Sequence, residues 1–208
     1  MANLKTRYTD GARRGFFRVG VVLSQRGVTA DMLTYFGLLL QVGVVPLVLT
    51  GNFVWAVPLG VIAAICDALD GAVARAGAGP TTAGAFLDSA TDRISELLVA
   101  GALAIYFAGK NEWWTAGAAL LFLGASQMVS YTRARAEALG VDCKVGFMSR
   151  PERLVGLGIG FVLSGWHVGG TSMLVWFVWL LAVLTSLTVV HRMLHVMRKL
   201  RRLDAGRP

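Results

Sequence analysis

The stretch Cys66–Arg93, CDALDGAVARAGAGPTTAGAFLDSATDR, carries four aspartates in or beside segments that are otherwise apolar enough to cross a membrane. They are Asp67, Asp70, Asp88 and Asp92. A carboxylate at membrane depth is costly, so four of them on adjacent segments require cations, water or a function that compensates for them. The stretch therefore bears on both the fold and the chemistry of the chain.

Helical spacing arranges the aspartates in two pairs. Asp67 and Asp70 would share one helix face, as would Asp88 and Asp92, with separations of roughly 4.5 and 6 Å along the axis. The segment between the pairs, residues 76–83, contains two glycines, a proline and two threonines, a composition typical of a tight turn. Two such helices would form a cluster of carboxylates that suits Mg²⁺ or Mn²⁺. The alternative is a salt-bridged acidic cluster without a metal.

Written as a pattern, the stretch is D-x-x-D-G-x-x-A-R, eight residues, then G-x-x-x-D-x-x-x-D. This pattern resembles the signature of the CDP-alcohol phosphotransferase (phosphatidyltransferase) family. Every specified position is present: Asp67, Asp70, Gly71, Ala74, Arg75, Gly84, Asp88 and Asp92. So many specified residues at fixed spacing seldom coincide by chance.

The composition indicates a polytopic membrane protein. Of 208 residues, 55% are hydrophobic and only 15% are charged, and the mean hydropathy is +0.61, which is too apolar for a soluble domain of this length. The net charge is +8, but the basic residues lie at segment ends. We therefore expect anionic lipid headgroups and phosphorylated substrates as partners, and no nucleic acid.

We expect an all-α integral membrane fold in one domain, residues 1–208. Six apolar runs can span as helices: residues 32–50, 53–75, 84–108, 113–134, 154–168 and 172–190. Residues 1–30 mix arginines with apolar side chains and predict an amphipathic helix on the membrane surface, with a flexible tail as the alternative. The six-helix bundle would occupy residues 31–199, followed by a basic tail, residues 200–208.

The distribution of lysine and arginine predicts the topology. The N-terminal arm, the turn after the second span, the connection between the fourth and fifth spans and the C-terminal tail are basic, whereas the other three connections contain only Lys110. Under the positive-inside rule, both termini and the aspartate-bearing turn are cytoplasmic. We therefore expect a multi-pass protein of the cytoplasmic (inner) membrane with its active site on the cytoplasmic side.

A second group of polar residues is rich in arginine. The segments S-Y-T-R-A-R-A-E-A-L-G, residues 130–140, and S-R-P-E-R-L, residues 149–154, belong to one connection. Their arginines are Arg133, Arg135, Arg150 and Arg153, and Arg192 lies on the same side at the end of the last span. A guanidinium group suits a phosphate dianion; the alternative is an ordinary positive-inside loop. In the acidic cluster, Asp92 is the candidate general base.

These segments and residues 27–34 extend the resemblance to the phosphatidylinositol phosphate synthase branch of the family, best known in actinobacteria. The sequence departs from that branch at Ala30, where proline is usual, and at Arg133, where lysine is expected. The resemblance implies six transmembrane helices preceded by a surface helix, and a homodimer. It also implies transfer of a phosphatidyl group from CDP-diacylglycerol to myo-inositol phosphate, which gives phosphatidylinositol phosphate and CMP.

The resemblance also implies roles for individual residues. Asp67, Asp70 and Asp88 would hold a first Mg²⁺, with Mn²⁺ as an option, and Asp67, Asp88 and Asp92 would share a second ion. Asp92 would be the general base. Contacts to the CDP-lipid would come from Asp31, Met32, Leu33, Thr34, Gly71, Arg75 and Thr81. The acceptor's phosphate would be bound by Arg133, Arg153 and Arg192, supported by Arg135 and Arg150.

Three alternatives remain open at this point. Glycerol 3-phosphate is a second acceptor, because it also carries phosphate, and would make the protein a phosphatidylglycerophosphate synthase. A divalent-cation transporter would use the carboxylates for translocation, but it predicts acidic residues at mid-depth in further spans. An intramembrane prenyltransferase also uses aspartate pairs on a metal-bound pyrophosphate, but it would not need the glycine and Ala74-Arg75 spacing.

Overall fold

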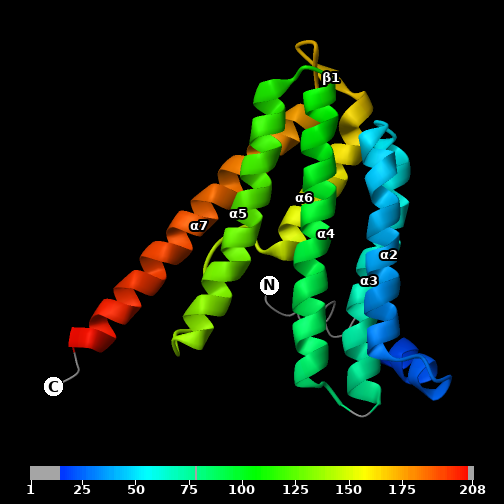
Figure 1. Ribbon diagram of the computed structural model, residues 1–208, viewed down its shortest axis with the longest axis vertical. Helices are drawn as coiled ribbons and strands as arrows, with labels where there is room; N and C mark the ends of the chain where they lie inside the picture. The colour runs from blue at the N-terminus through cyan, green and yellow to red at the C-terminus, as the bar shows by residue number, and fades with distance from the viewer. Residues whose placement is uncertain (1–14, 78, 206–208) are drawn as a thin grey trace, which may run out of the picture. The chain divides into compact units, whose positions relative to one another are not determined.

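The computed structural model describes residues 15–77 and 79–205, and this part of the chain is mostly helical, with one short two-stranded ribbon (Figure 1). Residues 15–25 form a first helix. The long helices are α2 (Ala30–Leu49), α3 (Phe53–Ala76), α4 (Thr82–Gly109), α5 (Trp113–Ala138), α6 (Arg150–Val162) and α7 (Met173–Ala205). After a 3₁₀ turn, Leu163–Gly165, the antiparallel strands β1 (His167–Val168) and β2 (Thr171–Ser172) lead into α7. The predicted all-α class is confirmed.

Three helices of the described residues are long and apolar enough to cross a membrane: α2, α3 and α7. Together with the apolar composition, they identify a membrane protein. Helix α4 is long but carries the acidic residues of its first half, and α6 has only 13 residues. At 1.5 Å per residue, α6 extends about 20 Å, which is less than the hydrocarbon thickness of about 30 Å.

Two helix boundaries differ from the predicted spans. Helix α6 begins at Arg150, with Pro151 in its first turn, a position where proline needs no hydrogen-bond partner; it ends at Val162, before the ribbon. Helix α7 continues to Ala205, because residues 191–205 contain neither glycine nor proline to end it. Residues 200–205 of the predicted tail are therefore helical, and residues 206–208 lie outside the described part.

The predicted surface helix is described only over residues 15–25. Phe16 and Phe17 are exposed on it, whereas Gly20 faces α3: a Cβ on Gly20 would lie 2.8 Å from the carbonyl carbon of Ala72. Glycine at this position therefore permits the two helices to approach closely. Residues 1–14, which include Arg7, Arg13 and Arg14, lie outside the described residues. The location of this helix on the membrane surface stays a prediction.

The contacts divide the chain into two compact units. The first unit groups Met1–Pro46 with Pro58–Ser95, and the second groups Leu47–Val57 with Glu96–Pro208. In the first unit, α2 and α3 approach closely at glycines: a Cβ on Gly43 would lie 3.1 Å from Leu59. In the second unit, α7 packs along both α5 and α6, and its buried residues include Val178 and Leu181. A single domain over residues 1–208 stays a prediction.

Candidate functional site

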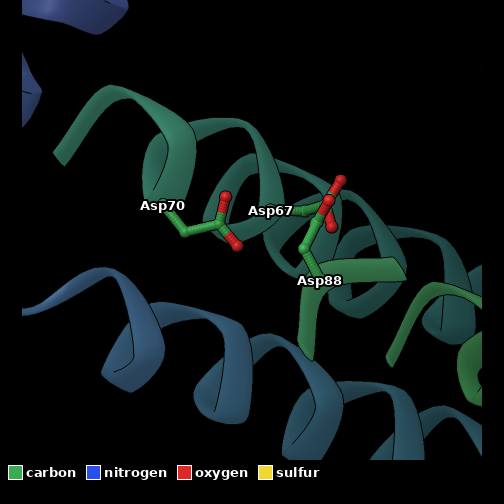
Figure 2. Close-up of side chains that lie close together, drawn as sticks. All are labelled: Asp67, Asp70 and Asp88. Atoms are coloured by element: carbon green, nitrogen blue, oxygen red, sulfur yellow. The ribbon is translucent and has the colours of Figure 1, made fainter. Parts of the chain in front are cut away.

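Three of the four predicted metal ligands lie together in the first unit. Asp67 and Asp70 come from α3 and Asp88 from α4, and one carboxylate oxygen of each lies within 4.8 Å of the others. Figure 2 shows the side chains of Asp67 and Asp88 meeting from the two helices, with Asp70 beside them. The spacing of three residues on α3 puts both of its aspartates on one face. Three hard oxygen donors converging in this way fit a divalent cation such as Mg²⁺ or Mn²⁺.

Asp70 is held in place by a neighbouring helix. Its carboxylate is buried and accepts a hydrogen bond of 2.7 Å from the hydroxyl of Thr34 on α2. That hydroxyl also lies 3.1 Å from the carbonyl oxygen of Ala30, one turn earlier. A hydrogen bond from a neighbouring residue, here from Thr34 to Asp70, orients a metal-binding carboxylate. Thr34, predicted as a CDP-lipid contact, is therefore also a support for the acidic cluster.

Asp92 lies one helical turn after Asp88 on α4 and is half-buried. It is not part of the group of three carboxylates. Its predicted roles as a ligand of a second ion and as general base therefore stay predictions. The interval of four residues keeps it on the same face of α4 as Asp88.

A cavity of about 480 Å³ opens beside the acidic cluster within the first unit. Its lining includes four residues of the predicted CDP-lipid set, together with Asp70 and Asp88. The four are Asp31, Thr34, Gly71 and Thr81. The other three predicted contacts, Met32, Leu33 and Arg75, are not among the lining residues. The volume lies within the range of pockets that hold small organic ligands.

Two helix N-termini border this cavity. The hydroxyl of Thr29 accepts a hydrogen bond of 3.2 Å from the amide of Met32 at the start of α2. At the start of α4, the hydroxyl of Thr81 accepts one of 3.0 Å from the amide of Gly84. Helix N-termini carry partial positive charge and favour phosphate groups. A cavity between an acidic metal cluster and two helix N-termini suits a metal-bound pyrophosphate.

The two glycines of the signature make room for specific neighbours. A Cβ on Gly84 would lie 3.1 Å from the Thr81 hydroxyl that accepts its amide proton. A Cβ on Gly71 would lie 3.3 Å from Nη1 of Arg75, so the guanidinium of Arg75 packs against the helix face at Gly71. Both distances are shorter than ordinary Cβ contacts, so side chains there would displace these groups.

The predicted phosphate-binding arginines lie in the second unit, and two of them are buried. Arg192 on α7 is 5% exposed; its Nε donates to the carbonyl of Val145 at 2.8 Å and its Nη1 to that of Val129 at 2.7 Å. Arg153 on α6 is 2% exposed; it forms an ion pair with Glu96 and donates from Nη1 to the carbonyl of Met148 at 3.0 Å.

The remaining predicted arginines are more accessible. Arg133 is 52% exposed and pairs with Glu137, one turn further along α5, at 2.9 Å. The charges of Arg133 and Arg153 both act on Arg192, so these three arginines form one electropositive group, which we call the arginine group. Arg135 is exposed and Arg150 half-buried. Because Arg135 follows Arg133 by two residues, it points about 200° away around the helix.

The start of α6 includes a further polar contact. The hydroxyl of Ser149 donates a hydrogen bond to the carboxylate of Glu152. This hydrogen bond is the main cause of a lowered pKa for Glu152, followed by a backbone hydrogen bond. The position of Glu152 in the first turn also favours its charged form, since the helix N-terminus is positive.

The sequence interpretation missed Glu96. It follows Asp92 by four residues, so the spacing D-x-x-x-D-x-x-x-E continues the acidic face of α4 by one turn and could have indicated it. The carbonyl partners of the arginines at Val129, Val145 and Met148 left no such signal, because every residue has a carbonyl.

The profile of the CDP-alcohol phosphatidyltransferase family matches residues 27–188. The chain is 38% identical over 186 residues to a phosphatidylinositol phosphate synthase of Mycobacteroides abscessus, covering 85% of this chain and 80% of the relative. It is 34% identical over 177 residues to an archaetidylinositol phosphate synthase of Methanothermobacter thermautotrophicus, covering 83% of this chain and 85% of the relative.

Solved structures of the Mycobacterium tuberculosis phosphatidylinositol phosphate synthase share the fold. With CDP-DAG bound, that enzyme has a TM-score of 0.80 to this chain and 34% identity, covering 88% of this chain and 94% of the other. In complex with manganese and citrate, it has a TM-score of 0.80 and 33% identity, covering 88% of each chain.

Proposed function

This chain belongs to the CDP-alcohol phosphatidyltransferase family, and we propose that it transfers the phosphatidyl group of CDP-diacylglycerol to myo-inositol phosphate. The products are phosphatidylinositol phosphate and CMP. The observation that carries the proposal is the cavity of the first unit, in which Asp70 and Asp88 face two helix N-termini. Relatives named for this activity support the acceptor. Family membership argues against the transporter and the prenyltransferase.

Asp67, Asp70 and Asp88 are the proposed ligands of a first Mg²⁺, with Mn²⁺ as an alternative, and Asp92 completes a second site with Asp67 and Asp88. The short distances among Asp67, Asp70 and Asp88 support the first site, and the interval of four residues on α4 places Asp92 on the same face as Asp88 for the second. When bound, a divalent cation neutralises charge on the pyrophosphate of the substrate. The hydrogen bond from Thr34 holds the Asp70 carboxylate in one orientation.

The CDP moiety occupies the cavity, with its phosphates toward the N-termini of α2 and α4. Asp31, Thr34, Gly71 and Thr81 contact it from the lining. Met32, whose side chain is exposed, and Leu33 contact the lipid portion beside the cavity. Arg75 contacts the CDP-lipid from its position against Gly71. The diacylglycerol chains remain in the bilayer, where their burial requires no cavity in the protein.

The chemical step is a displacement at the β-phosphorus. Asp92 takes the proton of the acceptor's hydroxyl, and the hydroxyl oxygen forms a bond to phosphorus. The bond from phosphorus to the oxygen of CMP breaks, and CMP leaves with the electron pair. The phosphatidyl group is then joined to the acceptor.

The acceptor's phosphate binds to the arginine group. Arg192 supports this proposal best, because its hydrogen-bond partners are carbonyl oxygens rather than a carboxylate, so its positive charge is left to attract an anion. Arg133 and Arg153 add charge, and Arg135 and Arg150 support the binding from the same connection. Glycerol 3-phosphate would use the same charges.

The proposal includes the membrane arrangement. Six spans follow a surface helix, both termini and the active site face the cytoplasm, and two copies form a homodimer. The distribution of lysine and arginine supports the orientation.

The test uses purified full-length protein in detergent with CDP-diacylglycerol and Mg²⁺, and it measures CMP release. The acceptors are myo-inositol phosphate, glycerol 3-phosphate, free inositol and serine. Release with inositol phosphate alone supports the proposal. Release with glycerol 3-phosphate instead keeps the reaction and replaces the acceptor, and release with none of the four, from folded protein, contradicts the proposed function.

A further inference from the structure

Glu96 and Arg153 form a buried ion pair within the second unit. Their side chains are 9% and 2% exposed, and the Nε and Nη2 of Arg153 both donate to the Oε1 of Glu96. Removing two charges from water is expensive, and such a pair often stabilises a fold no better than apolar residues would. The burial of this pair therefore indicates a role other than stabilising the fold.

The hydrogen bonds of Arg153 leave part of its guanidinium available. An arginine has five N–H donors; two donate to Glu96 and one to the carbonyl of Met148. The other two N–H groups have no hydrogen-bond partner among the described residues. Because three bonds to two different partners fix the plane of the guanidinium, the direction of the remaining donors is fixed as well.

The third bond connects the pair to the segment that carries the arginine group. Met148 lies in the connection between α5 and α6, directly before Ser149, the N-cap residue of α6. The carbonyl of Val145, in the same connection, accepts from Arg192. The amide of Met148 also donates to the hydroxyl of Thr188 on α7 at 3.3 Å. Residues 145–148 are therefore held between Arg153 and α7.

We propose that Glu96 is a positioning residue for the acceptor's phosphate: it fixes the guanidinium of Arg153, and through it the connection at Met148. This inference rests on the proposed function, because it concerns the arginine group as a site for a phosphate-bearing acceptor. Glu96 itself contacts neither substrate. Its effect on the reaction passes through Arg153.

Among the described residues, the ion pairs Arg133–Glu137 and Lys144–Asp142 of the second unit differ from the Glu96–Arg153 pair in exposure. Arg133–Glu137 has side chains 52% and 50% exposed, and Lys144–Asp142, at 3.5 Å, has side chains 73% and 61% exposed. Exposed pairs hold their partners weakly, because water competes for both charges. Asp142 therefore offers a matched control: D142N removes the same charge without removing a buried partner.

The experiment compares wild type, E96Q, E96D and D142N as full-length protein in detergent. We expect E96Q to raise the KM for the phosphorylated acceptor about tenfold, while kcat and the KM for CDP-diacylglycerol stay within about threefold. E96D, which keeps the charge on a shorter side chain, should fall between wild type and E96Q, and D142N should match wild type. If Glu96 were merely structural, E96Q would lower kcat and raise the KM of both substrates together.

The proposal would be overturned if E96Q left the acceptor KM unchanged. It would also be overturned if E96Q lowered kcat and raised both KM values by similar factors. If E96Q does not fold, E96D decides, with a rise of about threefold confined to the acceptor KM as the supporting result. A second measurement is independent of turnover: the shift of the unfolding temperature with inorganic phosphate. E96Q should require about tenfold more phosphate than wild type for the same shift, and equal requirements would contradict the role of Glu96.

The failure of the proposed function would be visible separately. The proposed function is tested by CMP release from the wild-type protein with the four acceptors. Glu96 is judged on whichever phosphorylated acceptor proves active and on inorganic phosphate. Glycerol 3-phosphate activity would therefore correct the acceptor and leave the role of Glu96 testable.

Discussion

The two units of this protein present charged side chains in opposite ways. In the first unit, Asp70 and Asp88 line an open cavity of about 480 Å³ with two helix N-termini beside it. In the second unit, Arg153 and Arg192 are buried and already bonded to groups of the protein itself. The cavity leaves room for a ligand beside these carboxylates, although Asp70 itself is buried and bonded to Thr34. The buried guanidinium groups are instead compensated for lost hydration by Glu96 and by backbone carbonyls. The first site is therefore open before ligands bind, and the second is held in position by its own hydrogen bonds.

The largest effect should come from the open cavity. D67N, or removal of divalent ions with EDTA, should lower turnover on the order of 10³-fold or more, because a bound cation supplies several kcal/mol of charge stabilisation. The measurement is CMP release, with the affinity for Mn²⁺ followed by electron paramagnetic resonance. Added Mg²⁺ should restore the wild type after EDTA. Full activity of D67N would remove the acidic cluster as the metal site.

A slightly smaller loss is expected at Asp92. D92N should lower kcat by about 10²–10⁴-fold, the usual contribution of a general base, while the protein stays folded and still binds CDP-diacylglycerol. CMP release measures the loss of kcat, and an equilibrium binding measurement tests whether CDP-diacylglycerol still binds. Turnover like that of wild type would exclude Asp92 as the base and limit the chemistry of the first unit to substrate binding.

Substitution of the buried Arg192 should weaken acceptor binding alone. R192K keeps the charge but cannot donate to both Val129 and Val145, so we expect the acceptor KM to rise about tenfold, equivalent to about 1.4 kcal/mol. The KM for CDP-diacylglycerol should not change. R133K is the matched control on an exposed side chain and should change the acceptor KM by less than about threefold. Equal effects of the two variants would contradict the distinction between buried and exposed arginines.

The smallest effect concerns the start of α6. Hydrogen bonding from Ser149 lowers the pKa of Glu152, so Glu152 contributes stability above the pKa it has in the unfolded chain, and this contribution is lost as the pH falls through its folded pKa. S149A should therefore lower the unfolding temperature slightly at pH 7, the effect being small because Glu152 is exposed to solvent, and this difference from wild type should disappear toward pH 3. Unfolding temperatures of the wild type and S149A between pH 3 and 7 test this. Parallel curves would contradict it.

Much of the fold followed from local patterns. The apolar runs and the turn at residues 76–83 predicted the starts of α3, α4 and α5 within two residues. The errors lie at helix ends: α6 ends at Val162 rather than at residue 168, and α7 continues to Ala205 because residues 191–205 contain neither glycine nor proline. Helices α4 and α6 are not among the three described helices that are long and apolar enough to span, because α4 carries charge and α6 is short.

The candidate site followed from spacing only where its residues share a helix face. Asp67, Asp70 and Asp88 lie together as the spacing predicts. The arginine group was predicted as charges on one connection, but Arg153 and Arg192 are buried against partners that are distant in the sequence. Glu96 lies 57 positions from Arg153, and Val129 lies 63 positions from Arg192. Such contacts are set by tertiary structure, and the order of residues along one helix does not encode them.

Helix α4 carries Asp88, Asp92 and Glu96 at intervals of one turn on a single face. Its backbone hydrogen bonds keep these intervals at about 6 Å, and inserting one residue between Asp92 and Glu96 would rotate Glu96 by about 100°. Insertions and deletions in this part of α4 should therefore be rare during divergence of the family. Adaptation to another alcohol would instead have to arise in the connection between α5 and α6, where a change in length leaves the order of the three carboxylates intact.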